Sequence, residues 1–101
     1  MNNYKNIYLA ELEDFLDENA DALLLDVRQE YEFQQFALEG AKLIPLPELE
    51  SRALEIDKFK DKLVVVYCKA GVRSIYACQI LHQLGFNNLY NLADGVIGLY
   101  H

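Results

Sequence analysis

Two short apolar runs, at 22–27 and 63–67, constrain the fold of this chain more than any other feature. Each is an almost unbroken series of apolar side chains rather than an alternation of apolar and polar ones. Such runs are typical of strands that are covered on both faces by other elements. Segments with helical apolar spacing alternate with them along the chain. The sequence therefore predicts an α/β fold in which helices cover both faces of a parallel sheet.

The same patterns place the remaining elements. Further strands are predicted over 41–44 and 88–92. The spacing of apolar residues predicts helices over 9–16, 30–36, 47–56 and 72–84. In the last segment, Val96 and Leu99 are expected to pack back onto the domain. A length of 101 residues is enough for one hydrophobic core, so we expect a single domain over residues 1–101.

Charge and cysteine content argue against several classes of protein. Lys and Arg number 9 against 16 Asp and Glu, and the net charge of −7 argues against binding to nucleic acid or to an anionic membrane. The longest apolar runs are far shorter than the ~20 residues of a membrane span. Met1–Lys5 does not open into a secretory signal. The 2 cysteines make no disulfide framework and fit a reducing compartment. We expect a cytoplasmic protein that acts as a monomer.

The segment Cys68–Ser74 carries the chemistry that the sequence indicates. It follows a predicted strand and leads into a helix, and ligands in open α/β sheets bind where strands end at their carboxyl edge. Gly71 permits a tight loop with inward N–H groups, and the helix adds the positive end of its dipole. With Lys69 and Arg73, these groups should favour the nucleophilic thiolate form of Cys68 without a histidine base. The alternative is that Cys68 is only a small buried apolar residue.

This segment resembles the active-site loop of the rhodanese-like sulfurtransferases. The resemblance covers nearly the whole chain, and it implies a parallel sheet of about five strands between helices. Its further matches are Asp26-Val27-Arg28 followed by an acidic-aromatic helix, Gly40-Ala41 with Ile44-Pro45, Leu84-Gly85-Phe86, and Leu92–Val96.

The chain departs from the family pattern at two places. Phe36-Ala37-Leu38 stands where the family often has Gly-His-Ile, and Tyr100 stands near the end, where the family tends to have a tryptophan. We expect the missing histidine to affect packing or the choice of partner, because it is not part of the cysteine loop. Neither departure removes the nucleophile.

The resemblance implies persulfide chemistry in two steps. Cys68, the catalytic residue, attacks the outer sulfur of thiosulfate or of a persulfide donor. A thiol, or cyanide in vitro, then takes the sulfur from the Cys68 persulfide, with no metal or organic cofactor. A protein could also act as the sulfur donor or acceptor. The candidates for substrate binding are Arg28 and the loop residues Lys69, Ala70, Gly71, Val72, Arg73 and Ser74.

Both arginines have a structural alternative. Arg73 either holds an anionic donor at the mouth of the site or folds back to pair with an acid. Arg28 either adds positive potential near Cys68 or forms an ion pair with Asp26 that fixes the loop after it. For Arg28 we favour the ion pair, because such a pair orders structure more reliably than it binds substrate.

The second cysteine and the histidines are not expected to take part. Cys78 lies about two helical turns beyond the loop, so it should pack in the core rather than act as a resolving thiol. His82 and His101 have no cysteine or carboxylate at ligand spacing, so we expect no metal site.

Other functions remain open on the sequence. One alternative is a sulfur-carrier or docking module that a protein desulfurase feeds and that passes the sulfur to a partner. A catalytically silent regulatory domain of the same fold is disfavoured, because Cys68 is present. Phosphatases and arsenate reductases that share the fold separate their cysteine from its arginine by one residue more than this chain does, which suits a tetrahedral oxyanion. That activity ranks below sulfur transfer.

Overall fold

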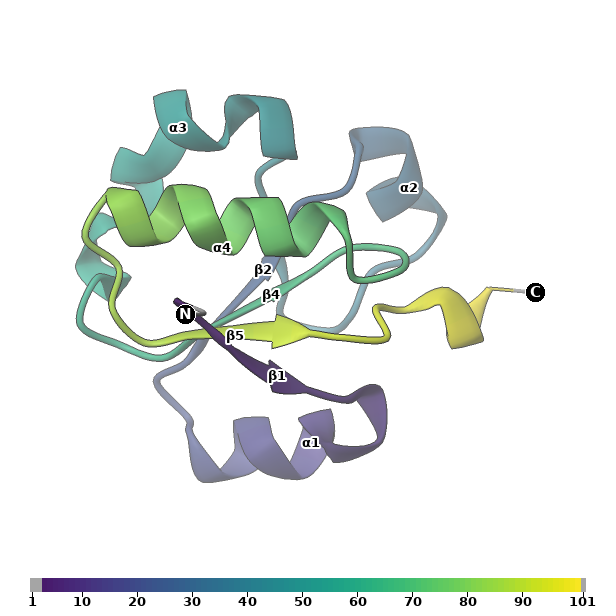
Figure 1. The fold of residues 1–101 in the computed structure, drawn as a ribbon. Helices are drawn as coiled ribbons and strands as arrows, with labels where there is room; N and C mark the ends of the chain where they lie inside the picture. The colour runs from purple at the N-terminus through teal and green to yellow at the C-terminus, as the bar shows by residue number, and fades with distance from the viewer. Residues whose placement is uncertain (1–2, 101) are drawn as a thin grey trace.

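The computed structural model describes residues 3–100 and contains a five-stranded sheet in the order β1-β5-β4-β2-β3, in which every pairing is parallel (Figure 1). The strands are β1 (Lys5–Ile7), β2 (Leu23–Asp26), β3 (Lys42–Leu43), β4 (Val64–Tyr67) and β5 (Leu89–Leu92). The α-helices are α1 (Leu9–Glu18), α2 (Glu30–Gln35), α3 (Leu49–Arg52) and α4 (Arg73–Gln83), and the short 3-10 helices are η1 (Leu46–Glu48), η2 (Ala53–Phe59) and η3 (Ile97–Leu99). The predicted fold class is confirmed.

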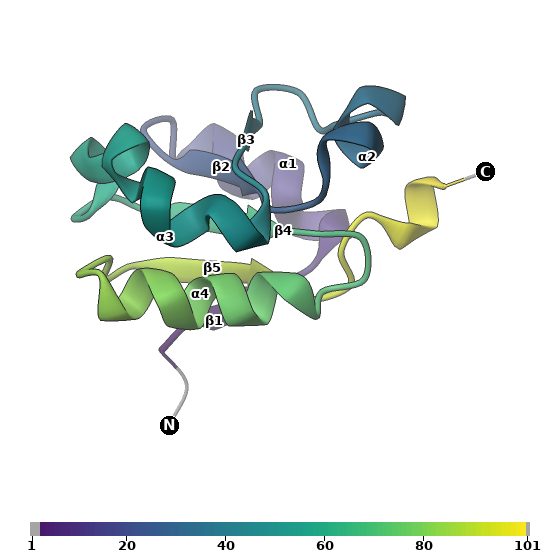
Figure 2. The same cartoon turned by 90° about the horizontal axis from the view of Figure 1, so that it is seen from above.

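The two apolar runs form the central strands. All residues of β2 and β4 are buried, and the two strands pair with Leu25 opposite Val66. Because side chains alternate along a strand, successive residues of β4 enter different cores. Val66 packs with residues of α3 and α4 on one face, and Val65 packs with residues of α1 on the other. Figures 1 and 2 show these helices on opposite sides of the sheet, so both faces are covered.

The structure differs from the sequence prediction in three places. The edge strand β1 was not predicted, because its two outer residues are polar and exposed and only Ile7 is buried. The helix expected over 47–56 is divided into η1, α3 and η2, and Ile56 has a non-helical backbone. Val96 packs into the core as expected, but Leu99 is 39% exposed and does not.

The parallel topology brings functional segments to one edge of the sheet. The carboxyl ends of β2, β4 and β5 point the same way, so the residues that follow them are neighbours. These segments are the residues after Asp26, the loop after Tyr67 and the turn after Leu92, and in Figure 1 they lie on the side of α2 and the C-terminus. Within residues 3–100, no helix has the length and hydropathy to cross a membrane.

Candidate active site

Cys68 lies directly after β4, at the centre of a small cradle of backbone N–H groups. Its Sγ accepts hydrogen bonds from the N–H of Gly71 at 3.2 Å and from the N–H of Ser74 at 3.4 Å. Ser74 belongs to the first turn of α4, so the sulfur also faces the positive end of that helix. Only 1% of Cys68 is exposed. The cradle is therefore suited to hold one sulfur-sized anionic atom.

The cysteine loop has this shape because the turn after β5 packs very close to it. Gly71 has φ +87°, and a Cβ at this position would lie 2.2 Å from the carbonyl oxygen of Ala93. On the other side, a Cβ on Gly95 would lie 2.3 Å from the carbonyl oxygen of Lys69. The N–H of Val96 then donates to that same Lys69 oxygen at 2.9 Å. The turn after β5 thus braces the cysteine loop, and both glycines are needed because no side chain fits.

Arg73 is paired with a carboxylate that the sequence analysis did not identify. Its guanidinium donates two hydrogen bonds to Glu32 of α2, at 2.7 and 2.9 Å. The Glu32 side chain is only 7% exposed, and the hydrogen bonds from Arg73 lower its pKa to about 2. The same hydrogen bonds raise the pKa of Arg73. The geometry corresponds to the structural alternative for Arg73, in which it ties α4 to α2 beside the loop.

Arg28 is fully buried and also paired. Its Nη2 lies 2.8 Å from Asp26 Oδ2, and its Nε donates to the same carboxylate. Nη2 also donates to the Phe36 carbonyl at 2.7 Å, and Nη1 donates to the Tyr100 hydroxyl at 2.9 Å. With all three guanidinium nitrogens hydrogen-bonded and 0% exposure, Arg28 fixes the segment after β2. An anionic donor would have to displace these partners to reach it.

The two departures from the family pattern contact each other. The rings of Phe36 and Tyr100 meet edge to face with centroids 4.9 Å apart. The guanidinium of Arg28 lies 5.0 Å from the Phe36 ring centroid. Lys69 lies over the other aromatic ring, with Nζ 4.5 Å from the Tyr100 centroid. One aromatic cluster therefore joins both departures to the cysteine loop.

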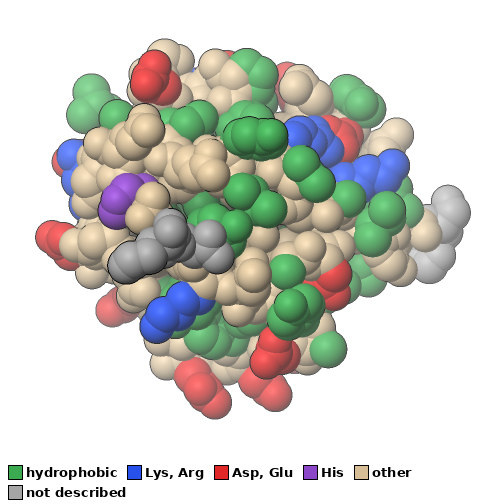
Figure 3. Space-filling model, in the orientation of Figure 1, with side chains coloured by type: hydrophobic (Ala, Val, Ile, Leu, Met, Phe, Trp, Pro, Cys, Tyr) green, Lys and Arg blue, Asp and Glu red, His purple; other side chains and the backbone are tan. Residues whose placement is uncertain are grey.

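The outer residues of the loop are accessible. Lys69 and Ala70 are exposed, and Val72 is 59% exposed, whereas Gly71 and Ser74 are buried beneath them. Figure 3 shows Lys and Arg side chains on the right of the molecule, in the region where Figure 1 places the loop and α2. The structure thus brings the loop candidates together around Cys68, with Arg73 at the border and Arg28 beneath the surface.

Two buried polar residues near the site were missed by the sequence analysis, namely Glu32 and Asn91. Asn91 lies in β5 and accepts a hydrogen bond from the Ser74 hydroxyl. The available signal was a polar residue between apolar neighbours in a predicted strand. Glu32 gave no comparable signal, because acidic residues are common on exposed helix faces.

Cys78 lies in the core between α4 and the sheet, as expected. Burial, with a smaller contribution from the charge of Cys68, raises the pKa of Cys78 to about 12. The thiol therefore stays protonated at neutral pH and is a poor nucleophile. Among residues 3–100, no group of three His, Cys, Asp or Glu could hold a metal ion. His101 lies outside the described residues.

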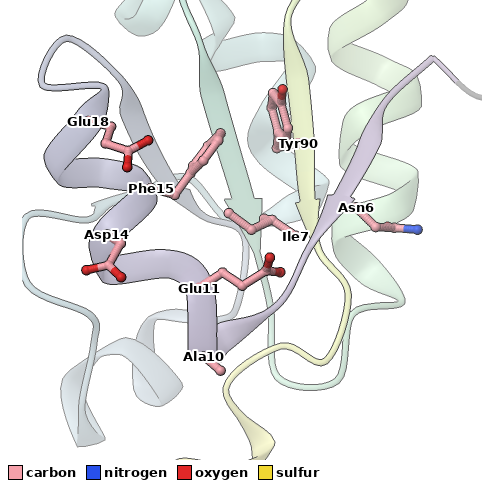
Figure 4. Close-up of a pocket in the computed structure, with 8 residues that line it drawn as sticks. All are labelled: Asn6, Ile7, Ala10, Glu11, Asp14, Phe15, Glu18 and Tyr90. Carbon is pink, nitrogen blue, oxygen red and sulfur yellow. The ribbon is translucent and has the colours of Figure 1, made fainter.

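A pocket of about 490 Å³ lies away from Cys68, between β1 and α1 (Figure 4). Three carboxylates of α1 line it, from Glu11, Asp14 and Glu18, together with apolar groups that include Phe15. None of the site residues that the sequence predicts lies in its wall. Cys68 and its loop therefore lie outside this pocket.

Comparison with known proteins agrees with this arrangement. The model of the rhodanese-like domain matches residues 8–99. A sulfurtransferase of Allochromatium vinosum is 38% identical over 82 residues, which span 81% of this chain and 75% of that protein. A probable adenylyltransferase/sulfurtransferase, MoeZ of Mycobacterium tuberculosis, is 34% identical over 86% of this chain, but this chain spans only 22% of its length. The structure of the human single-domain sulfurtransferase TSTD1 superposes with a TM-score of 0.75 at 28% identity and covers 89% of each chain. The chain therefore belongs to the rhodanese-like domain family.

Proposed function

We propose that this protein is a sulfurtransferase that carries a sulfane sulfur on Cys68. The observation that carries the proposal is the convergence of the Gly71 and Ser74 N–H groups on Sγ at the start of α4. Preorganised donors of this kind stabilise negative charge at a reacting sulfur. The names of the Allochromatium and human relatives support the same reaction class.

The reaction proceeds in two balanced steps. In the first, the Cys68 thiolate attacks the outer sulfur of thiosulfate, an S–S bond forms, and the bond to the sulfite group breaks with its electron pair. Sulfite leaves, and Cys68 holds an anionic persulfide. In the second step, a thiolate or cyanide attacks the outer sulfur, and the Cys68 thiolate leaves. No net oxidation occurs, so the cycle needs no electron carrier.

The charges around the site favour a second sulfur donor, a protein persulfide, as an alternative to thiosulfate. Thiosulfate is a dianion, yet Arg28 and Arg73 are each committed to a carboxylate, and Lys69 lies over an aromatic ring. A persulfide delivered by a protein desulfurase carries less charge and depends less on free cations. We therefore retain, as a second candidate, a sulfur carrier that is loaded by a protein. Either reaction needs a reduced thiol, which fits the cytoplasm.

The experiment is intact mass spectrometry of the reduced protein after incubation with thiosulfate, followed by peptide mapping. We expect the mass of one sulfur atom to be added on Cys68 and to be released by cyanide. Cys68→Ser should abolish the gain, whereas Cys78→Ala, which removes the buried second thiol, should retain it. Addition of a sulfur atom from a protein persulfide, but not from thiosulfate, would identify the protein as a sulfur carrier. The absence of both gains in a folded protein would refute the proposal.

A further inference from the structure

Cys68 is the first member of a hydrogen-bonded chain that crosses the sheet to its open edge. The thiol of Cys68 donates to Ser74 Oγ at 3.4 Å, and the Ser74 hydroxyl donates to Asn91 Oδ1. The amide of Asn91 then donates from Nδ2 to Asn6 Oδ1 at 3.3 Å. Ser74 and Asn91 are buried, whereas Asn6 is exposed on β1. The chain therefore connects the nucleophile to a surface residue.

The strand register accounts for this arrangement. β1 and β5 pair with Asn6 opposite Asn91, so both side chains leave the sheet on the same face. Figure 4 shows the Asn6 side chain pointing away from Phe15 and Glu11 of α1. Ser74 approaches from α4 on that face and contacts Asn91. Because Asn6 accepts from Nδ2, the amide oxygen of Asn91 is the end that faces Ser74.

This orientation matters because a serine hydroxyl has a single proton. When Cys68 is a thiol, every polar group in the hydrogen-bonded chain has a partner, because the S–H group donates to Ser74 Oγ. When Cys68 loses its proton, the Ser74 hydroxyl cannot donate to both the thiolate and Asn91. Either the charged sulfur faces an oxygen lone pair, or the buried Asn91 oxygen loses its donor. The persulfide avoids this conflict, because its charge lies on the outer sulfur and Sγ is neutral.

We propose that Asn91, oriented by Asn6, is a positioning residue that directs the Ser74 proton away from Cys68 and so disfavours the free thiolate relative to the persulfide. The inference rests on the proposed role of Cys68 in sulfur transfer. It assigns a function to two asparagines outside the cysteine loop.

Alkylation of Cys68 by iodoacetamide as a function of pH tests the inference, and peptide mapping separates Cys68 from Cys78. Asn91→Leu keeps the number and branching of the side-chain heavy atoms and removes the acceptor, so the Ser74 hydroxyl can rotate to the thiolate. We expect the midpoint of the profile to fall by about one pH unit. In a Ser74→Ala background the same substitution should produce no shift, because the effect passes through the hydroxyl.

The other charged and titratable groups near Cys68 are unchanged in these variants, so they cannot produce the difference. They are Arg73 and Cys78 on α4, Glu32 on α2 through its pair with Arg73, Lys69 in the loop, and Tyr100, whose ring Lys69 contacts. An unchanged midpoint in Asn91→Leu, or the same shift with and without Ser74, would overturn the inference. A residue that only supported the fold would not show this dependence on Ser74.

Asn6→Ala provides a test that does not disturb the core. Without its partner at the edge, the Asn91 amide can turn its Nδ2 toward Ser74, which again frees the hydroxyl proton for the thiolate. We expect a smaller downward shift of about 0.3 pH units, while Asn88→Ala, a change in another exposed asparagine, should leave the profile unaltered. If Asn91→Leu does not fold, the Asn6→Ala result decides, and the absence of a shift overturns the inference.

Loading with thiosulfate in the presence of sulfite distinguishes failure of this inference from failure of the proposed function. Above both midpoints, stabilising the thiolate in Asn91→Leu should lower the persulfide-to-thiolate ratio about tenfold. If alkylation shifts as expected but no persulfide forms in either protein, the positioning role stands and the proposed function fails. If persulfide forms with an equal ratio in both proteins, the positioning role fails and the proposed function stands.

Discussion

Gly71 is the position where one methyl group should have the largest effect on this protein. Its N–H donates to Cys68 Sγ, and its Cα faces the carbonyl of Ala93 across a gap that holds no side chain. Replacing Gly71 by alanine therefore perturbs the braced backbone and the nucleophile together. Gly40 offers a matched control, since it has a similar φ of +81° but nothing within 4 Å of an added Cβ.

The magnitude follows from two separate effects. An alanine with positive φ costs about 1–2 kcal/mol relative to glycine, and its smaller unfolded-state entropy offsets about 0.4–1 kcal/mol of this. Gly40→Ala should therefore destabilise the fold by about 1 kcal/mol. In Gly71→Ala the Cβ must also move from 2.2 Å to at least 3.0 Å from the Ala93 oxygen, and both contacting groups are backbone. Strain of this kind adds about 1–3 kcal/mol, for a total of about 3 kcal/mol.

The same displacement should affect the chemistry more than it affects the fold. Separating the loop from Ala93 moves the Gly71 N–H away from Sγ, where it now lies at 3.2 Å. A misplacement of ~1 Å in a reacting group can reduce the rate about 100-fold. We therefore expect persulfide formation in Gly71→Ala to fall about 100-fold, while Gly40→Ala retains the rate of the original protein.

Urea unfolding followed by circular dichroism measures the stability, and timed mass spectrometry with thiosulfate measures the rate of persulfide formation. Both are compared between Gly71→Ala and Gly40→Ala, so the shared cost of positive φ cancels. Equal stabilities would show that the contact with Ala93 is not restrictive. A normal rate in Gly71→Ala would show that the geometry of the loop does not control the nucleophile.

Two further predictions concern the partners of the arginines. Glu32→Gln should lower the free energy of unfolding at pH 7 by about 2 kcal/mol, because Arg73 loses a nearly buried partner. The folded-state pKa of Glu32 is lowered from its ordinary value of 4.5 to about 2. The stability that the Glu32 carboxylate contributes is therefore complete above pH 4.5 and is lost as pH falls toward 2. A stability difference between the two proteins that stays constant over this range would contradict the pairing of Glu32 with Arg73. Tyr100→Phe should cost about 1 kcal/mol in chemical denaturation, because the buried Arg28 loses the hydroxyl that it contacts at 2.9 Å. Tyr31→Phe, at a side chain that is 66% exposed, is the control, and equal effects of both changes would show that the Tyr100 hydroxyl contributes nothing specific.

The central strands and the cysteine loop were predictable because their signals are local. The runs at 22–27 and 63–67 are apolar over consecutive residues, so two-sided burial follows from the sequence. The loop is also continuous, and four of its features, namely the cysteine, the glycine, the arginine and the following helix, lie within a few residues of one another. Parallel topology then placed these residues at the carboxyl edge of the sheet.

The edge strand and the divided helix were not predictable for a different reason. β1 has only three residues, and its sequence alone does not favour a strand. Backbone pairing with β5 holds these residues in the extended conformation. The apolar spacing of Leu49 and Ile56 fits one continuous helix, but the segment is broken into a short α-helix and 3-10 turns that still bury both side chains. Packing between segments distant in sequence overrides local preference at such places.

The sequence by itself determined that this protein has a parallel sheet with helices on both faces and a cysteine in a glycine-containing loop at the end of a strand. Only the tertiary structure decided which groups surround that cysteine. Arg73 had many possible acidic partners, and the placement of α2 at the same edge of the sheet as the start of α4 (Figure 1) selected Glu32, 41 residues away. In the same way, the register of β1 and β5 brought Asn6 and Asn91 together beside Ser74. A hydrogen bond depends on distances of a few tenths of an ångström, and these are set by the packing of whole elements rather than by the pattern of any one segment.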